Sequence, residues 1–156
     1  MKVKMVCFDM DGTIADLYGV NGWLDMLRAY NPTPYIEAKP LWDMAELADT
    51  LMALQEVGIE VRIITWLAKD SNEAYNKAVR LAKREWLAEC GFPYNNFHGV
   101  AYGATKADSV RKYLAEDETA ILIDDNDKVR EGWHLGDTIN PTTENIIEIL
   151  KGLLNQ

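Results

Sequence analysis

Residues 3–13 of this chain, VKMVCFDMDGT, decide its fold. The near-continuous apolar run Val3–Phe8 is typical of a strand that is covered on both faces, and Gly12 allows the chain to turn sharply away. Asp9 and Asp11 therefore stand at the carboxyl end of a buried strand, where α/β proteins keep their reactive groups. If strand geometry persists, the two carboxylates point the same way and repel each other unless a cation lies between them. The stretch thus predicts a metal site.

The composition is typical of one globular domain. A chain of 156 residues is long enough to bury its own core, so we expect a single domain over residues 1–156. The net charge of −9 argues against broad, sequence-independent nucleic-acid binding, which needs Lys and Arg to neutralise phosphates. The only cysteines, Cys7 and Cys90, form no disulfide framework. Since no signal peptide or membrane-spanning run is apparent either, we expect a cytoplasmic protein with no membrane partner.

Strand-like and helical segments alternate along the chain. This alternation predicts an α/β fold, a three-layer Rossmann-like parallel sheet with helices on both faces. The expected strands after the first are Ile59–Thr65, Phe97–Tyr102 and Ala120–Ile123, and the expected helices are Met44–Val57, about Ser71–Cys90, one from Thr105 and one after Thr142. Asp70 with Glu73, and Thr105 with Asp108, are spaced as capping pairs for two of these helices.

Polar residues recur at the ends of the expected strands and at the start of one expected helix. In chain order they are Asp9 with Asp11, Thr65, Lys106, and Asp124 with Asp125. In this order the set closely resembles the haloacid dehalogenase superfamily of phosphoryl-transfer enzymes, whose first signature matches FDMDGTIAD at residues 8–16. The resemblance extends from Val3 to about Ile139.

The resemblance implies a chemical role for each motif. Asp9 would be the nucleophile that forms an aspartyl-phosphate, and Asp11 would be the general acid and base. Thr65 would bind the transferring phosphoryl group, and Lys106 would steady both nucleophile and phosphate. Trp66, which follows Thr65, is a further candidate for substrate binding, because an indole can stack on a base.

The resemblance also implies a Mg²⁺ site. Its ligands would be Asp9, the backbone carbonyl of Asp11, and the pair Asp124 and Asp125, of which Asp125 is favoured as the direct ligand. Elementary chemistry agrees, because attack of a carboxylate on a phosphate monoester brings two anions together and a divalent cation offsets their repulsion. Ligands that are all oxygen suit Mg²⁺.

Each motif has a simpler interpretation when it is taken alone. An Asp-x-Asp-Gly after an apolar run is often a turn, a strand-end threonine is usually a satisfied hydroxyl, and a lysine is usually on the surface. Their order along the chain favours the catalytic interpretation. A receiver-like phospho-accepting domain also clusters Asp, Thr and Lys around Mg²⁺, but in receivers the paired acids come first, whereas here Asp-x-Asp comes first.

The sequence constrains the substrate less than it constrains the reaction. Only residues 17–40 are available as a small cap, which implies an open site. Small-capped 5′-deoxynucleotidases share the DMDG start, while the phosphatase domain of phage-type polynucleotide kinases resembles the later half, around Lys83–Leu87 and Asp124–Trp133. The acidic composition favours a small nucleotide phosphate. A polynucleotide 3′-phosphatase that acts on a nucleic-acid end and a broad-specificity sugar-phosphate phosphatase remain open, as does the oligomeric state. Trp23 and Trp42 are further candidates for stacking on a base.

Overall fold

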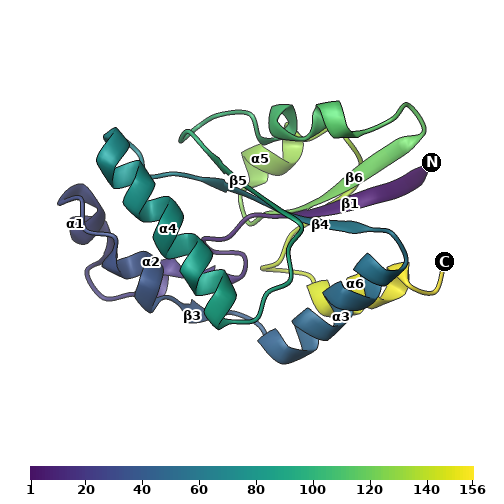
Figure 1. Ribbon diagram of the computed structural model, residues 1–156, viewed down its shortest axis with the longest axis horizontal. Helices are drawn as coiled ribbons and strands as arrows, with labels where there is room; N and C mark the ends of the chain where they lie inside the picture. Colours follow the sequence, from purple (N-terminus) through teal and green to yellow (C-terminus); the bar gives the residue numbers. More distant parts are fainter.

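The computed structural model describes residues 1–156 and confirms the three-layer α/β fold. A five-stranded sheet with the order β5-β4-β1-β6-β7 forms the middle layer. Its strands are β1 (Lys2–Phe8), β4 (Glu60–Trp66), β5 (Asn96–Val100), β6 (Glu118–Ile123) and β7 (Thr138–Ile139). Every pairing in this sheet is parallel, so the carboxyl ends of the strands meet at one edge. Helical segments lie on both faces of the sheet (Figure 1).

Alternate side chains of β1 enter two different cores. Val6 and Phe8 pack into the larger core and Met5 and Cys7 into the smaller one, and all four are fully buried. The helices of the larger core are α3 (Met44–Glu56), α4 (Glu73–Glu89) and α6 (Ile146–Leu153). The other face is covered by the short 3₁₀ segments η2 (Lys106–Ser109) and η3 (Arg111–Tyr113) and by α5 (Asp127–Glu131). A strand that is covered on both faces has little room for polar side chains, which explains the apolar run of β1.

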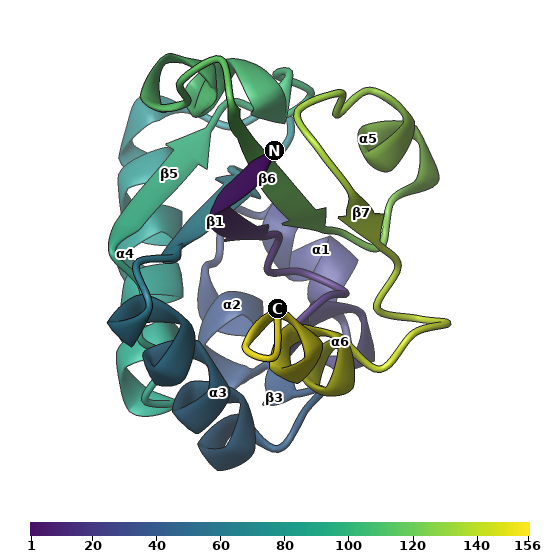
Figure 2. The same cartoon turned by 90° about the vertical axis from the view of Figure 1, so that its right-hand side faces the viewer.

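Residues 17–40 form a small insert next to α4. The insert comprises η1 (Leu17–Gly19), α1 (Trp23–Arg28) and α2 (Thr33–Glu37), and the two-residue strands β2 (Ala15–Asp16) and β3 (Lys39–Pro40) pair at its base. Leu17 and Tyr35 pack with Tyr75 and Val79 of α4 in a third, separate core. Figure 1 shows the insert at the end of the molecule opposite to both chain termini. In Figure 2, which is viewed from the termini, it lies at the far side.

Two expected helix caps were wrong. Helix α4 begins at Glu73, and its cap is Asn72, which accepts a hydrogen bond from the Tyr75 backbone N–H at 2.8 Å. Asp70 instead adopts a left-handed conformation with φ 53° and does not cap the helix. The segment after Thr105 is 3₁₀ rather than α-helical, and the Thr105 side chain makes no capping bond.

The sequence pattern did not predict α1, α2 or α5, because helices of five or six residues are too short to show a helical period. The two cysteines are free, Cys7 buried in β1 and Cys90 at the end of α4. No helix of the chain is both long and apolar enough to cross a membrane.

Candidate active site

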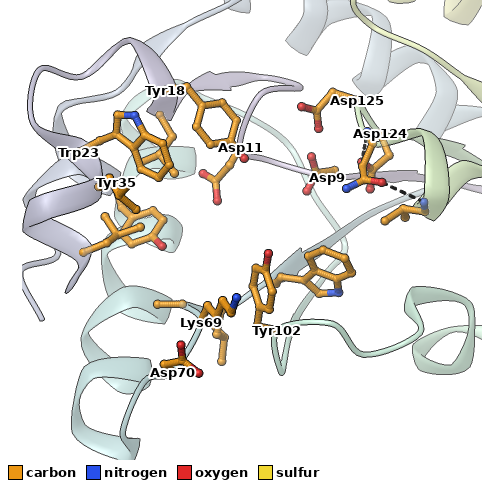
Figure 3. Close-up of a pocket in the computed structure, with 18 of the residues that line it drawn as sticks. Asp9, Asp11, Tyr18, Trp23, Tyr35, Lys69, Asp70, Tyr102, Asp124 and Asp125 are labelled. Atoms are coloured by element: carbon orange, nitrogen blue, oxygen red, sulfur yellow. Dashed lines mark hydrogen bonds between the residues drawn. The ribbon is translucent and has the colours of Figure 1, made fainter.

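Three carboxylates meet where β1 and β6 end. Asp9, Asp124 and Asp125 each place one oxygen within 4.8 Å of the others. The neighbouring strands bring them together, since Phe8 is in register with Ile123 and the Asp9 N–H donates to the Ile123 carbonyl at 2.9 Å. Figure 3 shows Asp9 and Asp125 facing each other across this point. The two acid motifs, distant in sequence, therefore form one cluster.

Lys106 ties two of these carboxylates together. Its ammonium lies 2.9 Å from Oδ1 of Asp9 and 2.7 Å from Oδ2 of Asp124, and the lysine is 4% exposed. Burial by itself would lower the pKa of Lys106, but the two carboxylates hold that pKa above its usual value. Lys106 is thus a fixed positive charge at Asp9.

The paired acids differ in what they contact. Oδ2 of Asp124 accepts from Lys106, and Oδ1 accepts from the Asn126 backbone N–H at 2.9 Å. Asp125 is more exposed, and its carboxylate accepts a single hydrogen bond, from the Thr13 hydroxyl at 3.5 Å. Burial and the negative charge of Asp9 raise the pKa of Asp124 to about 6 and that of Asp125 to about 7. One lysine does not balance three carboxylates, so the cluster has an excess of negative charge that a cation would relieve.

The Asp11 carboxylate lies outside the cluster of Asp9, Asp124 and Asp125, whereas strand geometry predicted that the Asp9 and Asp11 carboxylates would point the same way. Strand β1 ends at Phe8, and the chain then turns through Gly12 with φ 80°. As a result the Asp11 side chain binds a different lysine, accepting from Lys83 Nζ at 2.9 Å. Burial raises the pKa of Asp11, and the charge of Lys83 acts against that rise. The two aspartates therefore have separate electrostatic environments at one site.

Thr65 and Trp66 end β4, beside β1. The Thr65 hydroxyl is buried and accepts from Lys83 Nζ at 2.6 Å. The Trp66 indole N–H donates to the Ala104 carbonyl at 2.9 Å, and its ring lies 5.3 Å from the Lys106 ammonium. Trp66 reaches the open cleft, whereas Thr65 lies beneath its lining.

The carboxylates line a cleft of about 1030 Å³. In Figure 3, Tyr18, Trp23 and Tyr35 of the insert lie on one side of Asp11, and Lys69 and Tyr102 lie on another. The cleft is therefore bounded by aromatic side chains from two separate parts of the chain.

Trp42 does not reach this cleft. Its indole N–H donates to the Thr13 carbonyl at 2.8 Å, and its ring packs against the larger core. The expectation that it could stack on a bound base was wrong, because the ring is used in packing.

Solved structures with the same architecture include two phosphatases. D,D-heptose 1,7-bisphosphate phosphatase of B. bronchiseptica, complexed with magnesium and phosphate, matches 99% of this chain over 99% of its own length, with a TM-score of 0.54 and 14% identity. The Burkholderia thailandensis enzyme of the same name matches 86% of this chain over 74% of its own, with a TM-score of 0.51 and 18% identity. The chain shares the fold of these two phosphatases.

A third similar structure belongs to a nucleic-acid repair assembly. A chain of the Pnkp1/Rnl/Hen1 RNA repair complex matches 88% of this chain, with a TM-score of 0.58 and 17% identity. The present chain spans 42% of the length of that protein. No protein-family model matches the sequence, and no curated protein matches it either.

Sequence reasoning missed two residues of this site. Thr13 donates to Oδ2 of Asp9 at 2.9 Å and accepts from the Asp125 N–H at 3.2 Å, so it links the two acid motifs. Its place in the DGT signature was the available signal. Lys83 was noted only within the segment Lys83–Leu87 and was given no role, because a lysine on a helix is ordinarily solvated.

Proposed function

We propose that this chain is a Mg²⁺-dependent phosphomonoesterase that works through an aspartyl-phosphate on Asp9. The observation that carries the proposal is that two aspartates at one cleft are bound by two different lysines. Asp9 is held within the acidic cluster by Lys106 and Thr13, whereas Asp11 is held apart from it by Lys83. A nucleophile and a separate acid and base are the two groups that this chemistry requires.

In the first step, a carboxylate oxygen of Asp9 forms a bond to phosphorus. The bond from phosphorus to the leaving oxygen breaks, and its electron pair goes to that oxygen. The leaving oxygen takes the proton of Asp11 and departs as an alcohol. Lys106 favours the step by holding the Asp9 carboxylate in place and placing a positive charge beside the incoming phosphate.

In the second step, water hydrolyses the aspartyl-phosphate. Asp11, now a carboxylate, takes a proton from the water as the water oxygen bonds to phosphorus. The bond between Asp9 and phosphorus breaks, which restores the Asp9 carboxylate and releases inorganic phosphate. The raised pKa of Asp11 suits a group that must hold a proton in one step and accept one in the next.

The acidic cluster fits Mg²⁺ by its donor set, which consists of carboxylate oxygens only. We assign Asp9, the Asp11 backbone carbonyl, Asp124 and Asp125 to this site, with Asp125 as the direct ligand of the pair. Both oxygens of Asp124 already accept hydrogen bonds, which supports this choice. When bound, the ion would offset the repulsion between the Asp9 carboxylate and the phosphate.

The proposed substrates are nucleotide phosphates. The aromatic lining of the cleft supports this choice, because a base can stack on such rings. Tyr18 and Trp23 form an edge-to-face pair with ring centroids 5.0 Å apart, and the Trp66 ring lies at the same centroid distance from the half-exposed ring of Tyr102. The insert, residues 17–40, would act as a small cap within the single domain.

Two other substrate classes follow from the structural neighbours. The repair-complex match favours a phosphate at a polynucleotide end, and the heptose bisphosphate phosphatases favour a sugar phosphate. The net charge of −9 disfavours a long nucleic acid. We therefore place the mononucleotide first.

The test is phosphate release in Mg²⁺ and in EDTA from 5′- and 3′-nucleoside monophosphates, sugar phosphates and a 3′-phosphorylated oligonucleotide. We expect Mg²⁺-dependent turnover, fastest on a nucleoside monophosphate, and none from Asp9→Asn. Full activity of Asp9→Asn would overturn the mechanism. Much faster turnover of a sugar phosphate or of the oligonucleotide would replace the substrate class while leaving the chemistry in place.

A further inference from the structure

A second buried lysine, Lys83 on α4, lies at the site and has no part in the reaction described above. It is 1% exposed. Its three N–H groups have three acceptors: Oδ2 of Asp11 at 2.9 Å, Oγ1 of Thr65 at 2.6 Å and the Trp66 carbonyl at 2.9 Å. The ring centroid of Tyr35 lies 4.9 Å from the ammonium. A buried ammonium is costly unless its donors are satisfied, and here every donor has a partner.

The three acceptors do not belong to one element. Thr65 and Trp66 end β4, which is an interior strand of the sheet, while Asp11 lies in the turn after β1. Two bonds thus anchor the ammonium to the rigid end of β4, and the third reaches across to Asp11. No other side chain donates a hydrogen bond to the Asp11 carboxylate, so Lys83 is what fixes its orientation.

We infer that Lys83 is a positioning residue that holds Asp11 so that its second oxygen faces the leaving group. The inference rests on the proposed function. Because an ammonium donates and never accepts, it occupies Oδ2 of Asp11 as an acceptor. The proton that Asp11 transfers must then be carried by Oδ1, and the side chain is 18% exposed on the cleft. The arrangement selects one oxygen of Asp11 for the proton transfer.

This role differs from that of Lys106. Lys106 contacts the nucleophile and acts on every substrate alike, whereas Lys83 acts only through Asp11. Substrates with a good leaving group, such as p-nitrophenyl phosphate, need little proton donation, while a simple alkyl phosphate depends on it. Removal of Lys83 should therefore slow substrates with a poor leaving group more than substrates with a good one. A general loss of folding or packing would slow both alike.

The experiment compares Lys83→Met with wild type on p-nitrophenyl phosphate and on an alkyl phosphate. The first-turnover release of the leaving alcohol is measured, so that hydrolysis of the intermediate does not enter. We expect Lys83→Met to slow this release about 10²-fold for the alkyl phosphate and less than about 10-fold for the aryl phosphate. Arg84→Met, the same change at the exposed neighbouring residue of α4, is the matched control and should leave both rates unchanged.

A second variant separates lost positioning from lost folding, since Lys83→Met leaves the Asp11 carboxylate without its cation. Asp11→Asn removes that charge, and Lys83→Met is then added to it. If Lys83 acts through Asp11, adding Lys83→Met to Asp11→Asn slows alcohol release from the alkyl phosphate by less than about 3-fold. An equal loss on both leaving groups, or an undiminished loss in the Asp11→Asn background, would overturn the positioning role. Absence of wild-type turnover on every monoester would instead overturn the proposed function, and this inference with it.

Discussion

Lys106 binds Asp9 through an ammonium that lies 2.9 Å from Oδ1, and both residues are buried, at 4% and 7% exposure. The same ammonium contacts Asp124, so one cation serves a cluster of three carboxylates. Removing a carboxylate relieves repulsion in this cluster, whereas removing the lysine leaves buried anions uncompensated. Activity and stability should therefore respond differently to substitutions at these two positions.

Asp9→Asn and Lys106→Met should both lower turnover, with opposite effects on stability. Without metal, we expect Asp9→Asn to be at least as stable as wild type, because it removes one negative charge from the cluster. Lys106→Met should lose about 3–5 kcal/mol, because it breaks a buried ion pair. Urea unfolding in EDTA measures both effects. Equal destabilisation by the two substitutions would contradict the charge balance described here.

Mg²⁺ should stabilise the folded protein by binding to the acidic cluster. At a hundredfold excess over its Kd, a ligand of the folded state adds about 2.7 kcal/mol to the free energy of unfolding. We expect thermal unfolding to shift upward with Mg²⁺, and Asp125→Asn to remove most of the shift. Asp127→Asn is the matched control, because Asp127 lines the same cleft but lies outside the cluster. A full Mg²⁺ shift in Asp125→Asn would exclude Asp125 as the direct ligand.

Gly12→Ala should disturb the acidic cluster as well as strain the backbone. A Cβ at Gly12 would lie 2.3 Å from Oδ2 of Asp125 and 2.9 Å from the Tyr18 ring. Gly58 has a similar left-handed φ, 88° against 80°, but a Cβ added there would meet nothing within 4 Å. Gly58→Ala should thus cost only the backbone strain, about 1–2 kcal/mol. We expect Gly12→Ala to cost more and also to weaken the stabilisation by Mg²⁺. Equal losses in both variants would argue against the close approach of Gly12 to Asp125.

His98 should make the protein less stable as the pH falls. Burial, the Arg62 guanidinium at 3.0 Å from Nε2 and the charge of Lys112 lower the pKa of His98 from its usual 6.5. Above that usual value the imidazole is neutral in both states and imposes no penalty. As the pH falls through the usual value to the lowered one, the unfolded chain takes up a proton that the folded chain resists, so stability is lost.

His98→Gln keeps an oxygen that can accept from Arg62, and it should flatten this loss between about pH 7.5 and pH 5. Chemical unfolding of both proteins across this range measures the difference. Asp124 and Asp125, whose pKa values are raised, act in the opposite direction in metal-free protein, but they do so equally in wild type and variant. An identical pH dependence in the two proteins would show that the imidazole contributes nothing.

Much of the site could be predicted from local sequence. The apolar run ending at Asp9 and the run ending at Asp124 both read as buried strands, and in a parallel sheet the carboxyl ends of such strands meet at one edge. The cluster of Asp9, Asp124 and Asp125 follows from this geometry, because β1 and β6 are neighbours in register. The expected strands and the two longest helices were found because each is long enough to show its pattern of apolar residues.

What the sequence by itself determined is the identity of the acidic motifs and the edge of the sheet at which they gather. The resemblance already pairs Lys106 with Asp9, and the structure shows that contact, but only the tertiary structure decided that Lys83 binds Asp11. The first lysine comes from a 3₁₀ turn and the second from the middle of a helix, far along the chain from their partners. Local patterns report burial and periodicity, whereas the pairing of distant charges depends on how the layers pack, and that packing exists only in the folded chain.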